Sequence, residues 1–336
     1  MYTAVDRQTA LADHESNLIR TRWVKSKKGE EVRCLFVAQE IAAGDPRSDL
    51  FAGTPPLWAA RLLVSMAAMN HHRGWRLIGL DVACAFLYAS CERKLFIELP
   101  EMDEDAKDGT KIGMLRKALY GTRDAPRLWQ KHLKGIMVSL GFCESQLHPC
   151  VFWHPVKDIY VLAHVDDLLG VGPEANLRWM QRELEKQLEL KGKLLQDGET
   201  IQFLGRDIAM RNYGYTWAGD PKHAQLIIQE LGLQNANGVA VPVADDERHH
   251  GLETTDDSRK MGAEEARSYR RGAARVNYMA QDRPDLAHVA NLLSRSMSRP
   301  KCGDKQALKR VGRHLITRPR LDLVFRWQPV PDKLQV

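Results

Sequence analysis

The alternation of apolar and polar residues predicts short strands interrupted by amphipathic helices. Strands are expected where branched and aromatic residues are bounded by turn residues, and helices where apolar residues recur every three or four positions. The predicted strands are the hairpin TRWVKSKKGEEVRCLFVAQEI, then WRLIGLD, KLFIELP, PCVFWH, IYVLAHV, TIQFLGRDIAM and YGYTWAG. The predicted helices are PPLWAARLLVSMAAMNHHRG, APRLWQKHLKGIMVSLG, NLRWMQRELEKQLELKG and PKHAQLIIQELGL, followed by two at about 269–297 and 304–316. This mixed order favours an α+β fold over a regular βαβ series.

The same pattern divides the chain into four parts. Residues 1–22 are polar and are expected to form a loose tail. Residues 23–243 hold the alternating strands and helices. Residues 244–268 contain almost no large apolar residue, and we interpret them as a solvated linker. Residues 269–336 are expected to be rich in helix.

Composition narrows the class of protein. The 336 residues are 44% hydrophobic and 27% charged, which is typical of a soluble globular chain. No apolar run approaches the ~20 residues that span a bilayer, and the N-terminus lacks a signal region, so we expect neither a membrane partner nor secretion. The net charge of +6 permits a nucleic-acid partner without demanding one. The six cysteines are scattered and predict reduced thiols.

Two adjacent carboxylates stand out in the apolar stretch YVLAHVDDLLGVG. Asp166 and Asp167 separate two runs of strand-like residues. Burial of an unpaired carboxylate is costly, so the pair is expected at an exposed sheet edge. A two-residue hairpin loop made of these aspartates explains the position, because Asp tolerates the positive φ of such loops. The alternative is that Asp-Asp serves only as a favourable turn.

A third carboxylate, Asp81, interrupts the apolar strand RLIGLDVACAF. If this strand neighbours the Asp166-Asp167 hairpin, three carboxylates converge. Such a cluster suits Mg²⁺, which prefers a few carboxylates together with phosphates and water. Two ions ~4 Å apart can clamp the attacking and leaving oxygens of phosphoryl transfer. Nearby, Phe86 and the Gly/Pro-punctuated LYGTRDAPRLW are suited to a nucleotide site.

From about Trp23 to Phe325, the chain resembles the reverse transcriptase of copia-type long-terminal-repeat retrotransposons. The motifs that carry the resemblance are LDVACAFL, LYGTRDAPRLW, YVLAHVDD, QFLGRDI, YRRGAARVNYMAQDRPDLAHVANLLSRSMSRP and QALKRVGRHLITRPRLDLVF. Each match alone is weak, but six matches in the family's order are a specific signal.

The resemblance implies a polymerase right hand with a ferredoxin-like antiparallel palm sheet, fingers and a small thumb within 23–243, followed by a helical connecting segment. It implies that Asp81, Asp166 and Asp167 are catalytic and bind two Mg²⁺ ions, with Mn²⁺ as a possible substitute. Phe86 takes the place of the aromatic residue that excludes a ribose 2′-hydroxyl. The other residues implied at the nucleotide site are Arg33, Gly121, Asp124 and His164, and those implied to support the primer end are Phe203, Leu204 and Gly205.

The resemblance also implies partners and a location. The substrates would be an RNA or DNA template with its primer, and deoxynucleoside triphosphates. RNase H and integrase domains would belong to the full element, and the RNase H that follows in the family is absent before Val336. We therefore expect a fragment or decayed copy of a larger polyprotein. Its expected location is cytoplasmic, in the virus-like particle of the full element, with the nucleus as the alternative.

Several residues depart from the family's pattern. In the fingers strand, Leu35 takes the place of a triphosphate-binding Arg, and Gln39 the place of a Lys; Arg33 shares a strand face with position 35. Asp124 replaces a Gln, and its carboxylate would repel a triphosphate unless Arg123 or Arg127 pairs with it. His164 replaces a Tyr.

These departures sustain a second hypothesis, that of a decayed relic which only binds nucleic acid. A third is another two-metal phosphoryl-transfer enzyme, such as a nuclease.

Smaller signals have simpler interpretations. Cys143, His148, Cys150 and His154 match no usual zinc spacing. The pairs His71-His72 and His249-His250 are expected to be solvated, and Trp153, Trp179 and Trp217 to lie in the core. The C-terminal basic residues form either a wet helix face or a strip along a nucleic-acid backbone; they are Arg295, Arg299, Lys301, Lys305, Lys309, Arg310, Arg313, Arg318 and Arg320.

Overall fold

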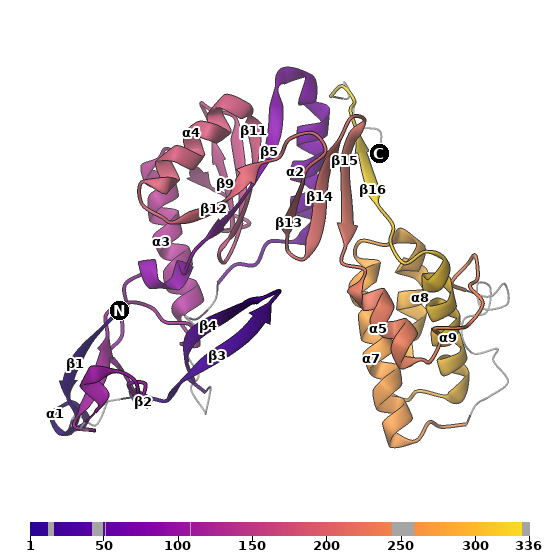
Figure 1. Ribbon diagram of the computed structural model, residues 1–336. Coiled ribbons are helices and arrows are strands. Elements are labelled where there is room, and N and C mark those ends of the chain that lie inside the picture. Colours follow the sequence, from indigo (N-terminus) through magenta and orange to yellow (C-terminus); the bar gives the residue numbers. More distant parts are fainter. Residues whose placement is uncertain (13–16, 42–49, 51, 108, 244–258, 331–336) are drawn as a thin grey trace. The chain divides into compact units, whose positions relative to one another are not determined.

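The computed structural model describes residues 1–12, 17–41, 50, 52–107, 109–243 and 259–330, and it divides into two compact units (Figure 1). The first unit is Met1–Leu194 and the second is Leu195–Val336. This boundary differs from the division expected at residue 243, because residues 200–219 form a sheet of their own with a strand from the C-terminal end. Among the described helices, none combines the length and apolarity needed to cross a membrane.

A six-stranded antiparallel sheet organises the first unit. Its strands lie in the order β12-β5-β11-β10-β9-β8. Their bounds are β5 (Trp75–Val82), β8 (Cys143–Glu144), β9 (Val151–His154), β10 (Ile159–His164), β11 (Asp167–Pro173) and β12 (Leu190–Leu194). β5 is the second strand from one edge and pairs with β11 on one side and β12 on the other. Its apolar residues are buried on both faces, as expected of a strand inside a layered domain.

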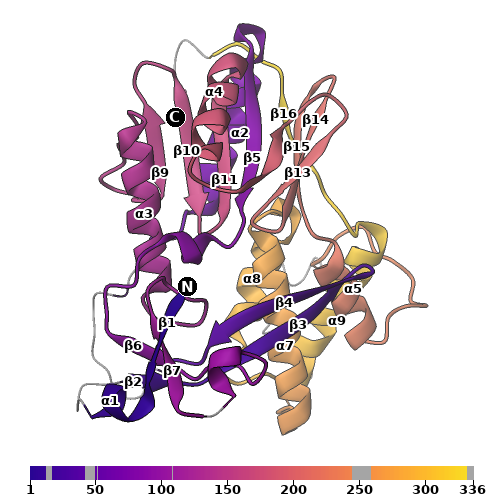
Figure 2. The same cartoon turned by 60° about the vertical axis from the view of Figure 1, so that its left-hand side comes forward.

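Helices cover both faces of this sheet (Figure 2). The helices α3 (Ala125–Ser139) and α4 (Glu174–Glu185) share one apolar cluster with the alternate β5 residues Ile78, Leu80 and Val82. The helix α2 (Leu57–Met69) contacts β5, β10 and β11, but its buried residues are absent from that cluster. Since side chains alternate along a strand, α2 packs on the other face, which is also the face of residue 81.

The strand β12 lies where the sequence pattern predicts the end of a helix. The helix expected over NLRWMQRELEKQLELKG stops at Glu185, and LKGKL pairs with β5 instead. Gly192 makes this possible: its φ is +134°, and a Cβ there would lie 2.1 Å from the Gly79 carbonyl oxygen. The spacing of apolar residues along the sequence does not indicate such a close approach of two backbones.

The N-terminal residues are ordered strands rather than the loose tail that their polarity predicts. β1 (Tyr2–Asp6) and β2 (Asn17–Ile19) flank β7 (Lys111–Leu115) and β6 (Leu95–Ile97) in a four-stranded sheet, and α1 (Arg7–Leu11) follows β1. Arg7 forms a two-point ion pair with Glu98 at 2.8 and 2.9 Å. All of these partners lie far away along the chain, so the local pattern does not report them.

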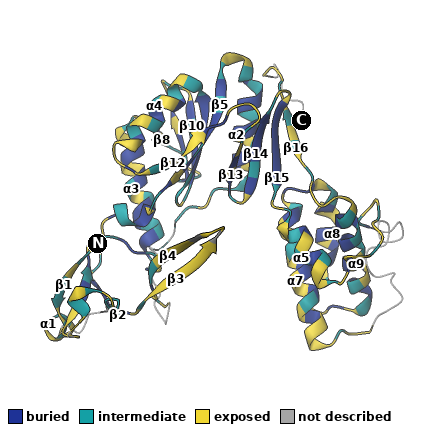
Figure 3. Cartoon of the chain, in the orientation of Figure 1, coloured by how far each residue is buried: buried dark blue, intermediate teal, exposed yellow. Residues whose placement is uncertain are grey.

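The predicted hairpin is confirmed as β3 (Thr21–Lys28) and β4 (Glu31–Ala38). Its turn consists of Gly29 and Glu30, because Lys28 pairs with Glu31. The hairpin is mostly exposed, whereas the six-stranded sheet is largely buried (Figure 3).

In its described residues, the second unit contains a four-stranded sheet and four helices. The sheet order is β13-β14-β15-β16, with β13 (Thr200–Phe203), β14 (Arg206–Arg211), β15 (Gly214–Gly219) and β16 (Leu323–Arg326). The helices are α5 (Lys222–Glu230), α7 (Ala263–Ala280), α8 (Pro284–Arg295) and α9 (Cys302–Thr317). Two expectations change: TIQFLGRDIAM is two strands, and the helix predicted over 269–297 breaks before Pro284, which cannot continue a helix hydrogen-bond ladder.

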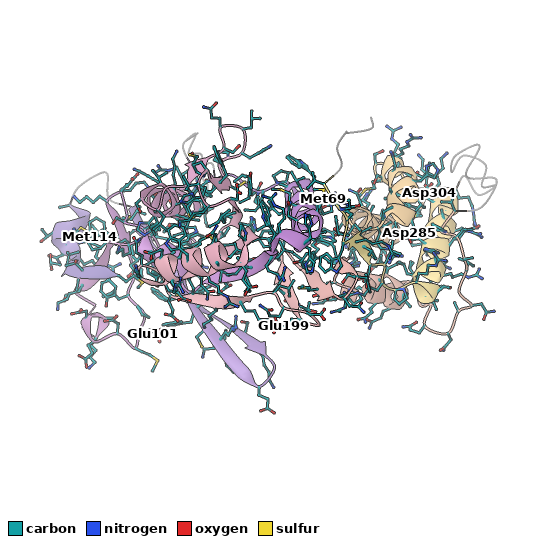
Figure 4. The ribbon with its side chains drawn as sticks, turned by 90° about the horizontal axis from the view of Figure 1, so that it is seen from above. Met69, Glu101, Met114, Glu199, Asp285 and Asp304 are labelled. Atoms are coloured by element: carbon teal, nitrogen blue, oxygen red, sulfur yellow. The ribbon has the colours of Figure 1, made fainter. Side chains whose placement is uncertain are left out.

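Buried ion pairs connect the elements of the second unit. Arg206 donates to Asp282 at 2.9 Å, and Trp217 Nε1 donates to the other carboxylate oxygen of Asp282 at 2.8 Å. Asp285 and Asp304, labelled in Figure 4, belong to the helical part. Asp285 accepts from Arg283 and His314, while Asp304 accepts from Ser296 and the Lys301 backbone. The polar segment Arg283-Pro284-Asp285 therefore takes part in ion pairs inside this unit.

We expect Gly170→Ala in β11 to destabilise the protein, because an added Cβ would lie 2.8 Å from Ile78 Cγ2 and 3.2 Å from Met180 Cε. Overpacking of this kind costs about 1–3 kcal/mol. The matched control is Gly135→Ala in α3, where nothing lies within 4 Å; it should stabilise by about 0.5–1 kcal/mol. Urea unfolding midpoints test both, and equal effects of the two substitutions would contradict the packing argument.

Candidate active site

Strand register brings the three predicted aspartates together. The Cα atoms of Asp81 on β5 and Asp167 on β11 are direct partners in the antiparallel pairing. Opposed residues of an antiparallel pair project from the same face of the sheet. Asp166 lies in the adjoining turn, and its carbonyl accepts the Val82 N–H at 2.8 Å. The cluster therefore sits at the end of two neighbouring strands, with Asp81 exposed and the other two half-buried.

The hairpin turn differs by one residue from the sequence prediction. Its two central residues are Val165 and Asp166, whereas Asp167 begins β11 opposite His164. The difference matters because a shift of one residue moves every side chain to the opposite face. With this register, Asp167 faces the same side as Asp81. The polar character of Asp-Asp suggested the loop, but the pairing of Leu168 with Leu80 decides the register.

The turn contains a strained residue. Val165 has φ +53°, which a β-branched side chain rarely adopts. A residue held in such a region costs on the order of 1–3 kcal/mol. Trp129 Nε1, from α3, donates a hydrogen bond to the Val165 carbonyl at 2.5 Å.

Burial and neighbouring charge raise the pKa values of Asp166 and Asp167. Burial, and then the charges of Asp166 and Asp81, raise the pKa of Asp167 to about 6. Burial and the charge of Asp81 also raise the pKa of Asp166. At neutral pH, the site therefore holds negative charges whose repulsion a cation would relieve.

The donor set fits a hard divalent cation that the substrate helps to hold. Among the described residues, no group of three or more His, Cys, Asp or Glu side chains forms a ready-made metal cage. Three neighbouring carboxylates nevertheless supply hard oxygen donors, and Mg²⁺ keeps several waters and phosphate oxygens when it binds few protein ligands. The arrangement is thus an open site on one sheet face.

Lys191 also lies at this site, although the sequence reasoning did not single it out. Its Cα pairs with that of Asp81 across β12 and β5, so both residues share a face. In the sequence, the only indication of Lys191 is that a charged residue stands at the end of a predicted helix.

The predicted aromatic residue Phe86 is buried beside the cluster. It lies in the 3-10 turn η2 (Ala85–Tyr88), which follows the left-handed residue Cys84. Its ring centroid is 4.5 Å from that of Tyr120. Burial, followed by the charges of Asp166, Cys84 and Asp81, raises the pKa of Tyr120 to about 12. Tyr120 therefore stays protonated beside the site, and the sequence motifs did not identify it as a site residue.

Gly121 has a specific backbone reason to be glycine. Its φ is +87°, and a Cβ there would lie 1.9 Å from the Ala38 carbonyl oxygen. The Ala38 N–H donates to the Tyr120 carbonyl at 2.7 Å, and the Glu40 N–H donates to the Gly121 carbonyl at 3.3 Å. These contacts join the end of β4 to the loop before α3.

Asp124 is paired, but not with the residues that the sequence suggested. Its buried carboxylate accepts two hydrogen bonds of 2.6 Å from Arg93, which also pairs with Glu40 at 2.9 and 3.0 Å. Burial opposes ionisation of Asp124, but Arg93 outweighs it and lowers the Asp124 pKa. Of the expected partners, Arg127 pairs with Glu92, and the backbone N–H of Arg123 donates to Glu40.

The structure connects the remaining predicted site residues less closely to the three aspartates. His164 is half-buried at the hairpin, its Nδ1 has no hydrogen-bond partner among the described residues, and burial lowers its pKa. Arg33 is exposed on β4. Phe203 is buried at the end of β13, and Leu204 and Gly205 form the β13–β14 turn with φ +51° and +71°. These three residues belong to the second unit.

Where the chain is described, several of the remaining histidine, tryptophan and basic residues make structural contacts. His154 is buried, and its Nδ1 accepts the N–H groups of Val156 and Lys157. Trp217 is buried as predicted, whereas Trp153 is 40% exposed. His249 and His250 lie outside the described residues. Of the basic residues, Lys305 pairs with Glu265, and Arg320 pairs with Asp207 and Asp322.

Comparison with known proteins gives matches along most of the chain. A family model described as reverse transcriptase (RNA-dependent DNA polymerase) matches residues 9–245. The chain is 26% identical over 311 residues to the retrovirus-related Pol polyprotein from transposon TNT 1-94 of Nicotiana tabacum, covering 88% of this chain and 23% of that one. It is 26% identical over 312 residues to the Pol polyprotein from transposon RE1 of Arabidopsis thaliana, covering 90% and 20%. The chain thus spans less than a quarter of these relatives' length.

A solved structure is also similar. The foamy viral protease-reverse transcriptase in complex with double-stranded DNA aligns with a TM-score of 0.46 and 10% identity, covering 87% of this chain and 43% of that one.

We expect Asp167→Asn to stabilise the protein at pH 8 and to stabilise it less at pH 5. The Asp167 carboxyl has a pKa of about 6 in the folded state, above its ordinary value of 3.8, so its ionisation opposes folding fully above pH 6; this cost declines as the pH falls below 6 and is lost only below 3.8. Urea unfolding at both pH values is the measurement. Asp197→Asn, at an exposed position, is the control, and a pH-independent gain would contradict the repulsion.

Removal of Arg93 should be far more damaging than removal of Arg127. Arg93→Ala leaves the buried Asp124 carboxylate without its partner, a change that costs about 3–5 kcal/mol. Arg127→Ala breaks a pair with the more exposed Glu92 and should cost about 1 kcal/mol or less. Denaturant unfolding tests both, and Arg93→Ala/Asp124→Asn should recover part of the loss; no recovery would argue against the pair.

Proposed function

The chain belongs to the reverse transcriptase (RNA-dependent DNA polymerase) family, and from this premise we propose that it is the RNA-directed DNA polymerase domain of a copia-type retrotransposon. The matches to transposon Pol polyproteins confirm the resemblance carried by its motifs. The proposed reaction is nucleotidyl transfer onto a primer 3′-hydroxyl. The observation that carries it is the direct pairing of Asp81 with Asp167, with Asp166 in the adjoining turn.

The carboxylates provide the chemistry of this reaction. We assign Asp81 and Asp166 to hold two Mg²⁺ ions, with Asp167 supporting them from the same sheet face. Bound there, the ions would activate the primer hydroxyl and neutralise charge on the leaving pyrophosphate. The raised pKa values of Asp166 and Asp167 accord with this assignment: burial is their main cause, and the charge of the neighbouring carboxylates, which a cation would offset, adds to it.

The surrounding residues are assigned to the incoming nucleotide. Phe86, buried against Tyr120, would form the wall that excludes a ribose 2′-hydroxyl. In right-hand terms, we interpret the six-stranded sheet as the palm and the β3–β4 hairpin, which carries Arg33, as fingers. The sheet of the second unit would carry the primer support at Phe203, Leu204 and Gly205, and its helices the thumb and connecting segment.

The partners follow from this assignment. The template would be RNA or DNA with a primer, and the other substrates deoxynucleoside triphosphates. In a full element, RNase H and integrase domains would accompany this one in a cytoplasmic particle.

The test is primer extension on an RNA template with Mg²⁺ or Mn²⁺. Asp166→Asn should abolish incorporation, because it removes one of the assigned metal ligands. Asp197→Asn is the matched control and should retain the wild-type rate. Unchanged synthesis by Asp166→Asn would remove the proposed site, and degradation of nucleic acid without added nucleotides would indicate a nuclease.

A decayed relic that only binds nucleic acid is the second candidate, and Leu35 at the family's Arg position is the observation in its favour. Asp124 does not add to it, because its carboxylate already accepts two hydrogen bonds from Arg93. Activity that appears only in Leu35→Arg/Asp124→Gln would support decay. Incorporation by the unaltered chain would exclude it.

A further inference from the structure

The turn that carries Asp166 holds a conformation that its own residues do not favour. Val165 has φ +53° although it is β-branched. The residue is 36% exposed, so its own burial is only partial. A contact from outside the turn can hold this conformation.

Trp129 makes such a contact. Its indole N–H donates to the Val165 carbonyl at 2.5 Å. The residue is only 1% exposed and belongs to the apolar cluster that fixes α3 on the sheet. Its ring packs against Tyr88 with centroids 6.4 Å apart. Core packing therefore sets the direction of the donor, and the turn adjusts to it.

The acceptor of this hydrogen bond is the central peptide of the turn. The Val165 carbonyl belongs to the peptide plane that joins Val165 to Asp166. Rotation of that plane changes ψ of Val165 and φ of Asp166 together, because the peptide unit is rigid. A donor that fixes the carbonyl consequently fixes the backbone from which the Asp166 carboxylate projects. On the far side, the Asp166 carbonyl is held by the Val82 N–H, next to Asp81.

We propose that Trp129 is a positioning residue for Asp166: its buried indole N–H holds the strained Val165–Asp166 peptide so that the Asp166 carboxylate lies beside Asp81 and Asp167. Its catalytic consequence rests on the proposed polymerase function. As a positioning residue, Trp129 does not contact the substrate and acts only through the turn.

The principal test is Trp129→Phe, which keeps a buried aromatic ring and removes the N–H. We expect kcat for primer extension to fall about tenfold, the equivalent of one lost hydrogen bond, while KM for the nucleotide is unchanged. The Mn²⁺ concentration for half-maximal rate should rise, because a metal ligand is misplaced. Trp179→Phe, a partly buried tryptophan on the same cluster, is the control and should preserve kcat and the metal dependence.

Val165→Gly provides a rescue that a merely structural role of Trp129 would not show. Glycine enters the left-handed region without strain, so the turn no longer depends on the indole donor. In the Val165→Gly background, Trp129→Phe should therefore change kcat by less than about twofold, a non-additive result for residues in contact. Equal losses in both backgrounds would overturn the proposal.

Two readouts do not require activity, so failure of the polymerase assignment remains distinguishable. Mn²⁺ titration by electron paramagnetic resonance should show weaker binding in Trp129→Phe, and the Val82 amide should exchange its hydrogen faster because its acceptor on Asp166 moves. If Trp129→Phe does not fold, benzothienylalanine at position 129 preserves the ring shape without the N–H. Wild-type metal binding and Val82 exchange in such a variant would overturn the proposal.

Discussion

The pairing of β5 with β11 is the constraint on which the rest of the first unit depends. One register sets Leu80 against Leu168 toward α3 and α4, and the same register sets Asp81 against Asp167 on the opposite face. Because side chains alternate along a strand, the apolar core and the acidic site cannot be shifted independently. The burial of leucine therefore determines where the carboxylates meet. As an interior strand, β5 is held from both sides, since β12 pairs with its other edge.

The carboxylate cluster and its turn lower the stability that this strand register provides. Three carboxylates repel one another at the end of two strands, and Val165 carries a backbone conformation that few β-branched residues adopt. Both costs are local, and the apolar layers beside them supply the rigid surroundings that hold strained groups in place. Under the proposed function, the same cluster would hold the metal ions, which gives the repulsion a use at this position.

Departures from a family motif have to be interpreted with their spatial neighbours. Asp124 by itself indicates a carboxylate facing a triphosphate, and it suggested inactivation. In the structure, Arg93 holds that carboxylate together with Glu40, so the altered residue contributes to the joint between β4 and α3. The second unit gives a similar example, because Arg283 pairs with Asp285, and Asp285 also pairs with His314. Charged residues in a motif can thus be explained here by buried pairing.

The sequence alone determined the family, most elements of the first unit and the identity of the three aspartates, because strand alternation, helical periodicity and motif order are local properties. The tertiary structure decided what depends on distant residues: the strands β1 and β2 in a segment that looked loose, and the end of α4 at a strand made possible by Gly192. It also decided the one-residue difference in the Val165-Asp166 turn and the partner of Asp124. In each case, the deciding contact joins residues far apart in the chain, and no local pattern records which of them will meet.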